Sequence, residues 1–169
     1  MLVRKTRNED VDQIIEIIEE IKEYLRINNI DQWQDNYPNK EVIKDDIAKG
    51  ISFVVSDNGR VIGTSVLSFQ EEETYNNIHE GKWLNNSSYG VIHRIAVINK
   101  GMRKGIGRFI YEEIERMCIK NEVFNIRVDT HEDNHNMKAF LLSQGFIYCG
   151  IIYLKSGAKR QAYQKILVR

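Results

Sequence analysis

The sequence has little proline, little cysteine and no excess of charge of either sign. It carries one proline and two cysteines in 169 residues, and its 24 Lys and Arg balance 24 Asp and Glu. A neutral chain has no global field to attract it to nucleic acid or an anionic membrane. No apolar run reaches the length of a membrane span, and the first residues lack a signal-peptide core. We therefore expect a cytoplasmic protein with neither membrane nor nucleic acid as a partner.

The composition also bounds the organisation of the chain. Hydrophobic residues make up 42% of the sequence, which suffices for one well-filled core but not for two ordinary domains. We find no internal repeat and no linker, and predict a single domain over residues 1–169. Cys118 and Cys149 lack the spacing of metal ligands, so we expect two buried thiols rather than a disulfide.

The most informative segment covers residues 91–108, where an apolar strand passes through a basic, glycine-containing turn into an amphipathic helix. Gly105 and Gly107 let the backbone approach an anion closely, and the first amides of a helix face such a ligand unpaired. Two nucleotide-binding loops are excluded by spacing. A dinucleotide fingerprint needs glycine where Ile110 stands, and only three residues separate Gly101 from Gly105, one fewer than a Walker loop needs.

Periodicity places the remaining elements. Apolar residues at helical spacing predict a helix from about Thr6 or Asn8 to Leu25 and another after the 91–98 strand, and Asp57-Asn58-Gly59 predicts a hairpin turn. Residues 70–88 are polar and aperiodic, and we expect them to form a long excursion over the site. The other expected helices cover about residues 40–49 and 136–144, and the other strands 2–5, 51–56, 61–69, 124–129, 146–154 and 161–167.

This pattern resembles the GNAT superfamily of N-acetyltransferases. The loop motif of that family, Gln/Arg-x-x-Gly-x-Gly/Ala, is read here from Met102 to Gly107, with Met102 in the place of Gln or Arg. Its second signature is matched by Asn134, with Gly145-Phe146 eleven and twelve residues later. The resemblance implies an α/β (α+β) fold with a mixed sheet of six to seven strands flanked by four helices. It also implies a splayed strand pair, at about 91–98 and 124–130, that binds acetyl-CoA.

The resemblance further assigns cofactor contacts. The pantetheine arm would pair with the backbone of the first splayed strand, and the pyrophosphate would lie on the loop. Asn134 would contact the cofactor arm, although a plain helix cap is an equal alternative. The implied cofactor-binding residues are Ile95, Ala96, Val97, Met102, Arg103, Lys104, Gly105, Ile106, Gly107, Arg108 and Asn134.

Acyl transfer to an amine needs a base, an oxyanion donor and a route for the thiolate. We expect His93 to be the base and a backbone amide at Ile95 to Val97 to be the donor. In the alternative, His93 is only packed in the protein, and Asp129, His131 or Glu132 acts as the base through water. The family commonly has a tyrosine general acid where this chain has Leu141. Either Tyr148 or Tyr153 replaces it, or the thiolate leaves unaided, since a thiol has a pKa of about 8.5.

The acceptor is expected to be a primary amine of a small molecule, amino acid or peptide, bound by Trp33, Tyr37, Asp129 and His131. Further aromatics, Tyr24, Tyr75 and Trp83, either line that site or pack over the core. The alternative function is a coenzyme A binding or sensing module with little catalysis, and the expected state is a monomer or homodimer.

The segment His131 to His135 also matches the zinc-protease pattern His-Glu-x-x-His, but a strand leads directly into it. We therefore expect these histidines to straddle a loop and to bind no metal.

Overall fold

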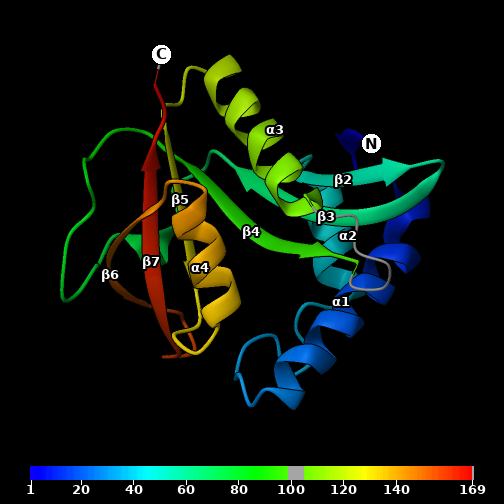
Figure 1. Ribbon diagram of the computed structural model, residues 1–169, viewed down its shortest axis with the longest axis horizontal. Coiled ribbons are helices and arrows are strands. Elements are labelled where there is room, and N and C mark those ends of the chain that lie inside the picture. The colour runs from blue at the N-terminus through cyan, green and yellow to red at the C-terminus, as the bar shows by residue number, and fades with distance from the viewer. Residues whose placement is uncertain (99–104, 169) are drawn as a thin grey trace. The chain divides into compact units, whose positions relative to one another are not determined.

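The structure is a computed structural model that describes residues 1–98 and 105–168. Strands and helices follow one another in the order predicted from the sequence (Figure 1). The strands are β1 Leu2–Lys5, β2 Ser52–Asp57, β3 Arg60–Ser68, β4 Gly90–Val97, β5 Asn125–Thr130, β6 Ile147–Tyr153 and β7 Lys159–Ile166. The helices are α1 Val11–Ile27, α2 Lys40–Ala48, α3 Ile106–Lys120 and α4 His135–Ser143, with short 3₁₀ turns at Asn8–Asp10 and Glu73–Tyr75.

The chain forms two compact units, and we describe each by itself. The first contains Met1–Leu67 and His93–Glu113, and the second contains Ser68–Ile92 and Ile114–Arg169, so that β4 and α3 contribute residues to both. Strands are hydrogen-bonded in the order β1-β2-β3-β4 in the first unit and β4-β5-β7-β6 in the second. The pairing of β4 with β5 is parallel and joins Gly90 to Ile126 and Val91 to Arg127. The β1–β2, β2–β3, β5–β7 and β6–β7 pairs are antiparallel, so the seven strands make the predicted mixed sheet.

The first unit buries one face of α1 and α2 against the strands. Ile14 and Ile18 of α1 and Ile43 of α2 share a core cluster with Val54 of β2 and Val61 of β3. With Val11, the α1 residues of this cluster recur at intervals of three and four, which places them on one stripe. α2 begins after Asn39, whose side chain accepts a hydrogen bond of 3.1 Å from the amide of Val42. An asparagine in this position satisfies a helix-terminal amide that would otherwise lack a partner.

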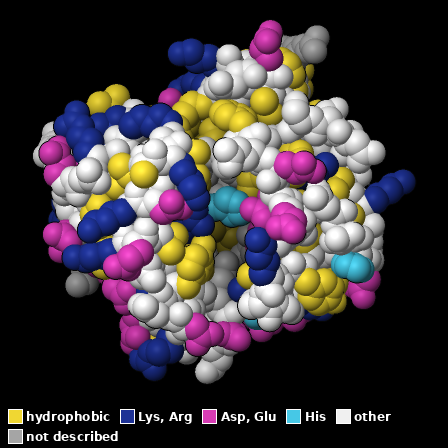
Figure 2. Space-filling view, turned by 180° about the vertical axis from the view of Figure 1, so that it is seen from behind, with side chains coloured by type: hydrophobic (Ala, Val, Ile, Leu, Met, Phe, Trp, Pro, Cys, Tyr) yellow, Lys and Arg dark blue, Asp and Glu magenta, His cyan; other side chains and the backbone are white. Residues whose placement is uncertain are grey.

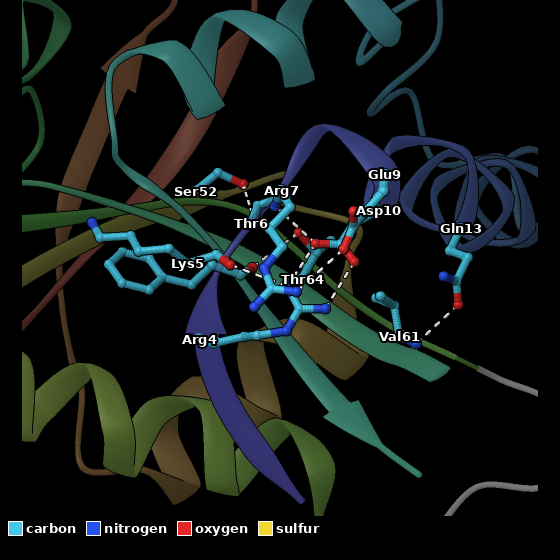
Figure 3. A network of polar contacts seen from close by, with 11 residues as sticks. Arg4, Lys5, Thr6, Arg7, Glu9, Asp10, Gln13, Ser52, Val61 and Thr64 are labelled. Atoms are coloured by element: carbon cyan, nitrogen blue, oxygen red, sulfur yellow. Dashed lines mark hydrogen bonds and ion pairs between the residues drawn. The ribbon is translucent and has the colours of Figure 1, made fainter. Parts of the chain in front are cut away.

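A polar network fixes the start of α1 (Figure 3). Both terminal nitrogens of Arg4 donate to the carboxylate of Asp10, at 2.6 and 2.8 Å, and the backbone amide of Arg7 donates to the same carboxylate. The hydrogen bond from Arg4 is the main reason why the pKa of the buried Asp10 is lowered. One turn later, Gln13 accepts from the amide of Val61 at 3.0 Å. The network therefore joins the end of β1, the first turns of α1 and the start of β3.

The excursion that precedes β4 lies on β6 in the second unit. His79 and Ile151 exchange backbone hydrogen bonds of 2.8 Å in both directions. This approach depends on two glycines: a Cβ at Gly150 would lie 2.6 Å from the carbonyl oxygen of His79, and one at Gly81 would lie 2.0 Å from that of Cys149. Residues 70–88, which are polar and aperiodic in sequence, are therefore held by backbone contacts that no side-chain pattern predicts.

The excursion is also anchored by aromatic residues. Arg127 of β5 lies between the rings of Trp83 and Tyr89, with its guanidinium carbon 4.1 and 4.0 Å from the two centroids. Burial is the main cause that lowers the pKa of this arginine. A desolvated cation between two aromatic faces is a favourable arrangement.

The surface and the helices are consistent with the balanced composition. On the face shown in Figure 2, basic and acidic side chains are interspersed rather than gathered by sign. Within the described part of the chain, no helix is both long enough and apolar enough to cross a bilayer.

Candidate functional site

The passage from β4 to α3 lies in the first unit. Just beyond the end of β4, the amide of Ile98 donates to the carbonyl oxygen of Ile62 at 3.0 Å. Gly105 precedes α3 with a φ of +109°, and its carbonyl oxygen accepts the amide of Phe109 at 2.9 Å. No other part of the described chain comes within 4 Å of the position that a Cβ would take at Gly105. The predicted contacts Met102, Arg103 and Lys104 lie outside the described residues.

The first turn of α3 is the place where the sequence predicts a phosphate contact. Ile106 and Ile110 are buried, Gly107 is half-buried and Arg108 is exposed. Burying one side of the turn fixes the direction in which its amides point, and the first amides of a helix have no partner within that helix. The charge of Arg108 is shared with Glu112, since their side chains form an ion pair of 2.9 Å. The turn therefore presents backbone amides together with the paired side chain of Arg108.

Close packing brings α3 against the strands. A Cβ at Gly63 would lie 3.1 Å from Cδ1 of Ile110 and 3.4 Å from the carbonyl oxygen of Ala96. Any larger residue in this position would push the first turn of α3 away from β3 and β4. Gly63 therefore positions the turn through the close approach that its missing side chain allows.

Arg94 lies in β4 immediately before the predicted cofactor residues Ile95, Ala96 and Val97. Its φ is +47°, a left-handed conformation that is rare for a residue with a side chain. Such geometry persists only where surrounding contacts hold it, and it is frequent at functional sites. The predicted base His93 is the preceding residue and is half-buried in the same strand.

The contacts that hold Arg94 come from α2 and from the loop before it. Its Nε and one terminal nitrogen donate to the two oxygens of Asp46 at 2.7 and 2.6 Å. Its other terminal nitrogen donates to the phenolic oxygen of Tyr37 at 2.7 Å. Asp46 is only 2% exposed. The structure thus brings Tyr37, a residue predicted to bind the acceptor, to the strand predicted to bind the cofactor.

Trp33 belongs to the same loop. Its side chain packs against the core cluster of the first unit, and its φ is +58°. Residues 33–36 form one wall of an open, polar groove of about 400 Å³, and α1 forms the other wall. The residues of α1 that line it are Glu19, Lys22, Glu23 and Arg26. A groove of this size accommodates a small ligand or the end of a peptide.

Asp129 lies near the end of β5 in the second unit. Its Oδ2 accepts a hydrogen bond of 2.7 Å from the hydroxyl of Tyr75, a residue of the excursion that is 1% exposed. Burial, followed by the negative charge of Asp129, raises the pKa of Tyr75 well above its ordinary value. The phenol therefore remains a donor at any physiological pH. Trp83 in turn donates from its indole nitrogen to the backbone oxygen of Tyr75 at 2.8 Å.

His131 and Asn134 follow β5 in a turn. Asp133 donates from its backbone amide to Nδ1 of His131 at 3.1 Å, and the side chain of Asn134 accepts from the amide of Met137 at 3.2 Å. Asn134 is thus the cap of α4, which is one of its two predicted roles. His135 is the first residue of α4, so the two histidines of the zinc-protease pattern lie in a turn and a helix. Among the described residues, no group of three or more ligand-type side chains could hold a metal ion.

The two tyrosines considered as general acids lie on β6. Tyr148 is 43% exposed with its ring edge against Tyr163, and Tyr153 is 46% exposed with its ring against His79. Leu141 is fully buried on α4. The candidates therefore divide between the units: His93, Trp33, Tyr37 and the glycine turn belong to the first, whereas Tyr148, Tyr153, Asp129, His131 and Asn134 belong to the second.

Sequence reasoning did not find Arg94, Asp46 or the partner of Asp129. A signal exists for Asp46, because it falls three residues after Ile43 on the buried stripe of α2. A carboxylate on an apolar stripe requires a partner. No sequence signal identifies Arg94 as that partner, since the two residues are 48 positions apart.

Comparisons with known proteins agree with this geometry. The family model described as acetyltransferase (GNAT) family matches residues 14–146. A GNAT-family acetyltransferase from Streptococcus agalactiae is 33% identical, with a TM-score of 0.90 over 99% of this chain and 96% of that one. PaiA N-acetyltransferase from Thermoplasma acidophilum, solved with coenzyme A, is 16% identical with a TM-score of 0.74, covering 98% of each chain. Ribosomal-protein-alanine N-acetyltransferase from Brucella melitensis is 20% identical with a TM-score of 0.68, covering 99% of this chain and 100% of that one. Among curated protein sequences, none matches this chain.

Proposed function

Since the chain belongs to the GNAT family of acetyltransferases, and is thus an acetyl-CoA-dependent acyltransferase, we propose that it acetylates a primary amine of a small molecule, amino acid or peptide by direct attack on the thioester. The observation that carries this proposal is the start of α3 at Gly105. No part of the described chain beyond its immediate neighbours lies within 4 Å of the Cβ position there, and the other side of this helix is buried. We further propose that residues 1–169 act as one such domain, in the cytoplasm, as a monomer or homodimer.

The described residues suit acetyl-CoA. The backbone at Gly105 and the amides of Ile106, Gly107 and Arg108 would receive the pyrophosphate, and the backbone of Ile95, Ala96 and Val97 would pair with the pantetheine arm. Asn134 caps α4, and in this proposal it also contacts the cofactor arm. Bound acetyl-CoA supplies an activated acyl group; the amine nitrogen forms the new bond to the acyl carbon while the carbon–sulfur bond breaks.

Two protons must be managed in this reaction. The amine nitrogen loses a proton as it attacks, and His93, one residue before Arg94 in β4, is the proposed base. Asp129, His131 and Glu132 are the alternatives, acting through water. The carbonyl oxygen becomes negative and would be stabilised by a backbone amide at Ile95 to Val97. The thiolate would take a proton from Tyr148 or Tyr153, or leave unaided, because Leu141 offers none.

One observation favours the alternative of a coenzyme A sensor. Leu141 is fully buried at the position where the family commonly has its tyrosine, so α4 contributes no hydroxyl there. A sensor would bind coenzyme A tightly but would not release thiol in response to amines. An enzyme without a general acid would be slowed by a factor of about 10² to 10⁴ rather than silenced.

The experiment that separates the two functions is an assay of thiol release from acetyl-CoA. Amines, amino acids and short peptides serve as acceptors, and Gly105→Glu serves as the site-blocked protein. Gly59→Glu is the matched control, because Gly59 also has a positive φ and open surroundings but lies in the β2–β3 turn. Release that depends on an acceptor and is lost only in Gly105→Glu supports the enzyme. Tight coenzyme A binding without release for any acceptor supports the sensor.

A further inference from the structure

The hydroxyl of Tyr37 is oriented by a cation. An arginine side chain has donors only, so in the 2.7 Å contact the phenolic oxygen of Tyr37 must accept from Arg94. The phenolic hydrogen is not used in that contact and must point away from the guanidinium. Because Tyr37 is 40% exposed, that hydrogen can reach a ligand.

Arg94 is itself held firmly. Asp46 binds it through both carboxylate oxygens, and the left-handed backbone of Arg94 fixes the direction in which its side chain leaves β4. Burial acts to lower the pKa of Arg94, but Tyr37 and Asp46 outweigh it, and the net pKa is raised. The cation therefore persists at all pH values of interest. A guanidinium held by a carboxylate in this way allows its hydrogen-bond partner a smaller range of directions than a lysine ammonium would.

The position of Tyr37 relates it to both substrates. Its phenolic oxygen is hydrogen-bonded to the side chain of Arg94 in β4. Arg94 directly precedes Ile95 to Val97, where the acyl group is proposed to bind. Tyr37 also follows residues 33–36, which line the open polar groove. That groove presents carboxylates and cations together, with Glu19 paired to Lys22 and Glu23 paired to Arg26. Walls of this kind suit a peptide or amino acid more than a hydrocarbon chain.

We propose that Tyr37, aimed by Arg94, is a specificity-determining residue that donates a hydrogen bond to an oxygen of the acceptor, so that the preferred acceptors are amino acids or peptides rather than simple alkylamines. This inference rests on the proposed function, since it concerns the acceptor of the same reaction. A carboxylate or amide carbonyl beside the reacting amine supplies the required oxygen. An alkylamine has no such oxygen, so the hydroxyl of Tyr37 donates to water instead.

The test combines one variant with two matched acceptors. L-alaninamide carries the amide carbonyl, and its hydrocarbon analogue has an isopropyl group in place of the carboxamide. Kinetic constants are measured for wild type and Tyr37→Phe with saturating acetyl-CoA. Each acceptor is compared with itself in the two proteins, so the different basicity of the two amines cancels. A single neutral hydrogen bond corresponds to a factor of about 2 to 12.

We expect Tyr37→Phe to raise the KM for L-alaninamide by about 2- to 12-fold with kcat unchanged, and to leave both constants for the hydrocarbon analogue unchanged. Arg94→Lys should raise the same KM, and adding Tyr37→Phe to it should raise that KM no further, because both residues act through one hydroxyl. An equal change for both acceptors, no change for either, or a wild type that prefers the hydrocarbon analogue would overturn the inference while the acetyltransferase assignment stands. Absence of release for every amine overturns the proposed function itself, and the inference with it.

Discussion

Tyr75 donates a 2.7 Å hydrogen bond to Asp129 although 54 positions separate them in the sequence. The bond joins the excursion before β4 to β5, and both residues lie in the second unit. One carboxylate oxygen of Asp129 is thereby held by a buried phenol. If Asp129 acts on the acceptor, as proposed, Tyr75 is the residue that orients it.

Replacing Tyr75 by phenylalanine should therefore destabilise the protein without changing its shape. The hydroxyl is lost while the ring can keep its place beside Trp83, and a hydrogen bond to a charged group contributes about 1.5 to 3 kcal/mol. The matched control is Tyr163→Phe, which loses a 3.2 Å contact with the neutral Gln161 and should cost about 0.5 to 1.5 kcal/mol. Urea unfolding of the two variants measures the difference, and equal losses would contradict this account.

Stability should fall as the pH rises above about 9, and Cys118 is one cause. Burial raises the pKa of its thiol from 9.0 to about 12. Below pH 9.0 both folded and unfolded states keep the proton, so the stability is fully present. Between the two pKa values only the unfolded state loses its proton, and stability declines by up to about 1.4 kcal/mol per pH unit. Tyr75 and Tyr111, whose pKa values are also raised, act in the same direction from pH 10.0 upward.

The variant that tests this contribution is Cys118→Ala. It removes a small buried side chain and lowers stability at every pH, so the slopes of stability against pH are compared rather than the absolute values. We expect a shallower decline than in wild type between about pH 9 and pH 11. A slope identical to that of wild type would show that the thiol ionises equally in both states.

Gly105→Glu should abolish binding of coenzyme A while the protein remains folded. At a φ of +109° any side chain strains the backbone by about 1 to 3 kcal/mol, and a carboxylate there repels phosphate. Gly59→Glu introduces the same side chain at a φ of +81° and should bind coenzyme A normally. Isothermal calorimetry gives both affinities. An unchanged affinity in Gly105→Glu would remove the loop from the proposed site.

The excursion should depend on Gly150. A Cβ there meets the backbone oxygen of His79 at 2.6 Å, so Gly150→Ala should lower the free energy of unfolding by about 1 to 3 kcal/mol or more. Gly157→Ala is the matched control, since its φ is also positive but nothing lies within 4 Å of its Cβ position. Hydrogen exchange of the His79 and Ile151 amides locates the effect. Slow exchange of both amides in Gly150→Ala would mean that the contact adapts.

His93→Ala should lower turnover with little effect on the affinity for coenzyme A, because the proposed role of this residue is proton transfer. The expected loss is about 10² to 10⁴ in kcat. A normal rate would assign His93 to packing, and Asp129, His131 and Glu132 would then be the bases to test.

Local patterns in the sequence were sufficient to predict the helices and strands of the fold. The expected helix at 40–49 is found as Lys40–Ala48, and the hairpin turn at Asp57-Asn58-Gly59 joins β2 to β3. The predicted family and its fold are confirmed by the comparisons. They could be predicted because a strand, a glycine turn and a helix in that order form a local signal. Periodicity and turn residues depend on neighbours in the chain, which is why they can be read directly.

The polar contacts of the site could not be read in the same way. Arg94 meets Asp46 across 48 positions, and Tyr75 meets Asp129 across 54. Each pair is determined by how whole elements are placed, and no pattern within one element encodes it. The left-handed conformation of Arg94 is equally hidden, because an arginine inside an apolar strand predicts ordinary extended backbone.

The sandwich of Arg127 between Trp83 and Tyr89 has a consequence for observing how the protein unfolds. Trp83 belongs to the second unit and lies against a cation, whereas Trp33 belongs to the first unit and packs on its apolar core. These are the two tryptophans of the chain. Trp33→Phe and Trp83→Phe thus each leave one native fluorophore, and each fluorophore reports on one unit alone. Coincident denaturation curves from the two variants mean that the chain melts as one cooperative body, and separated curves mean that it melts in two steps.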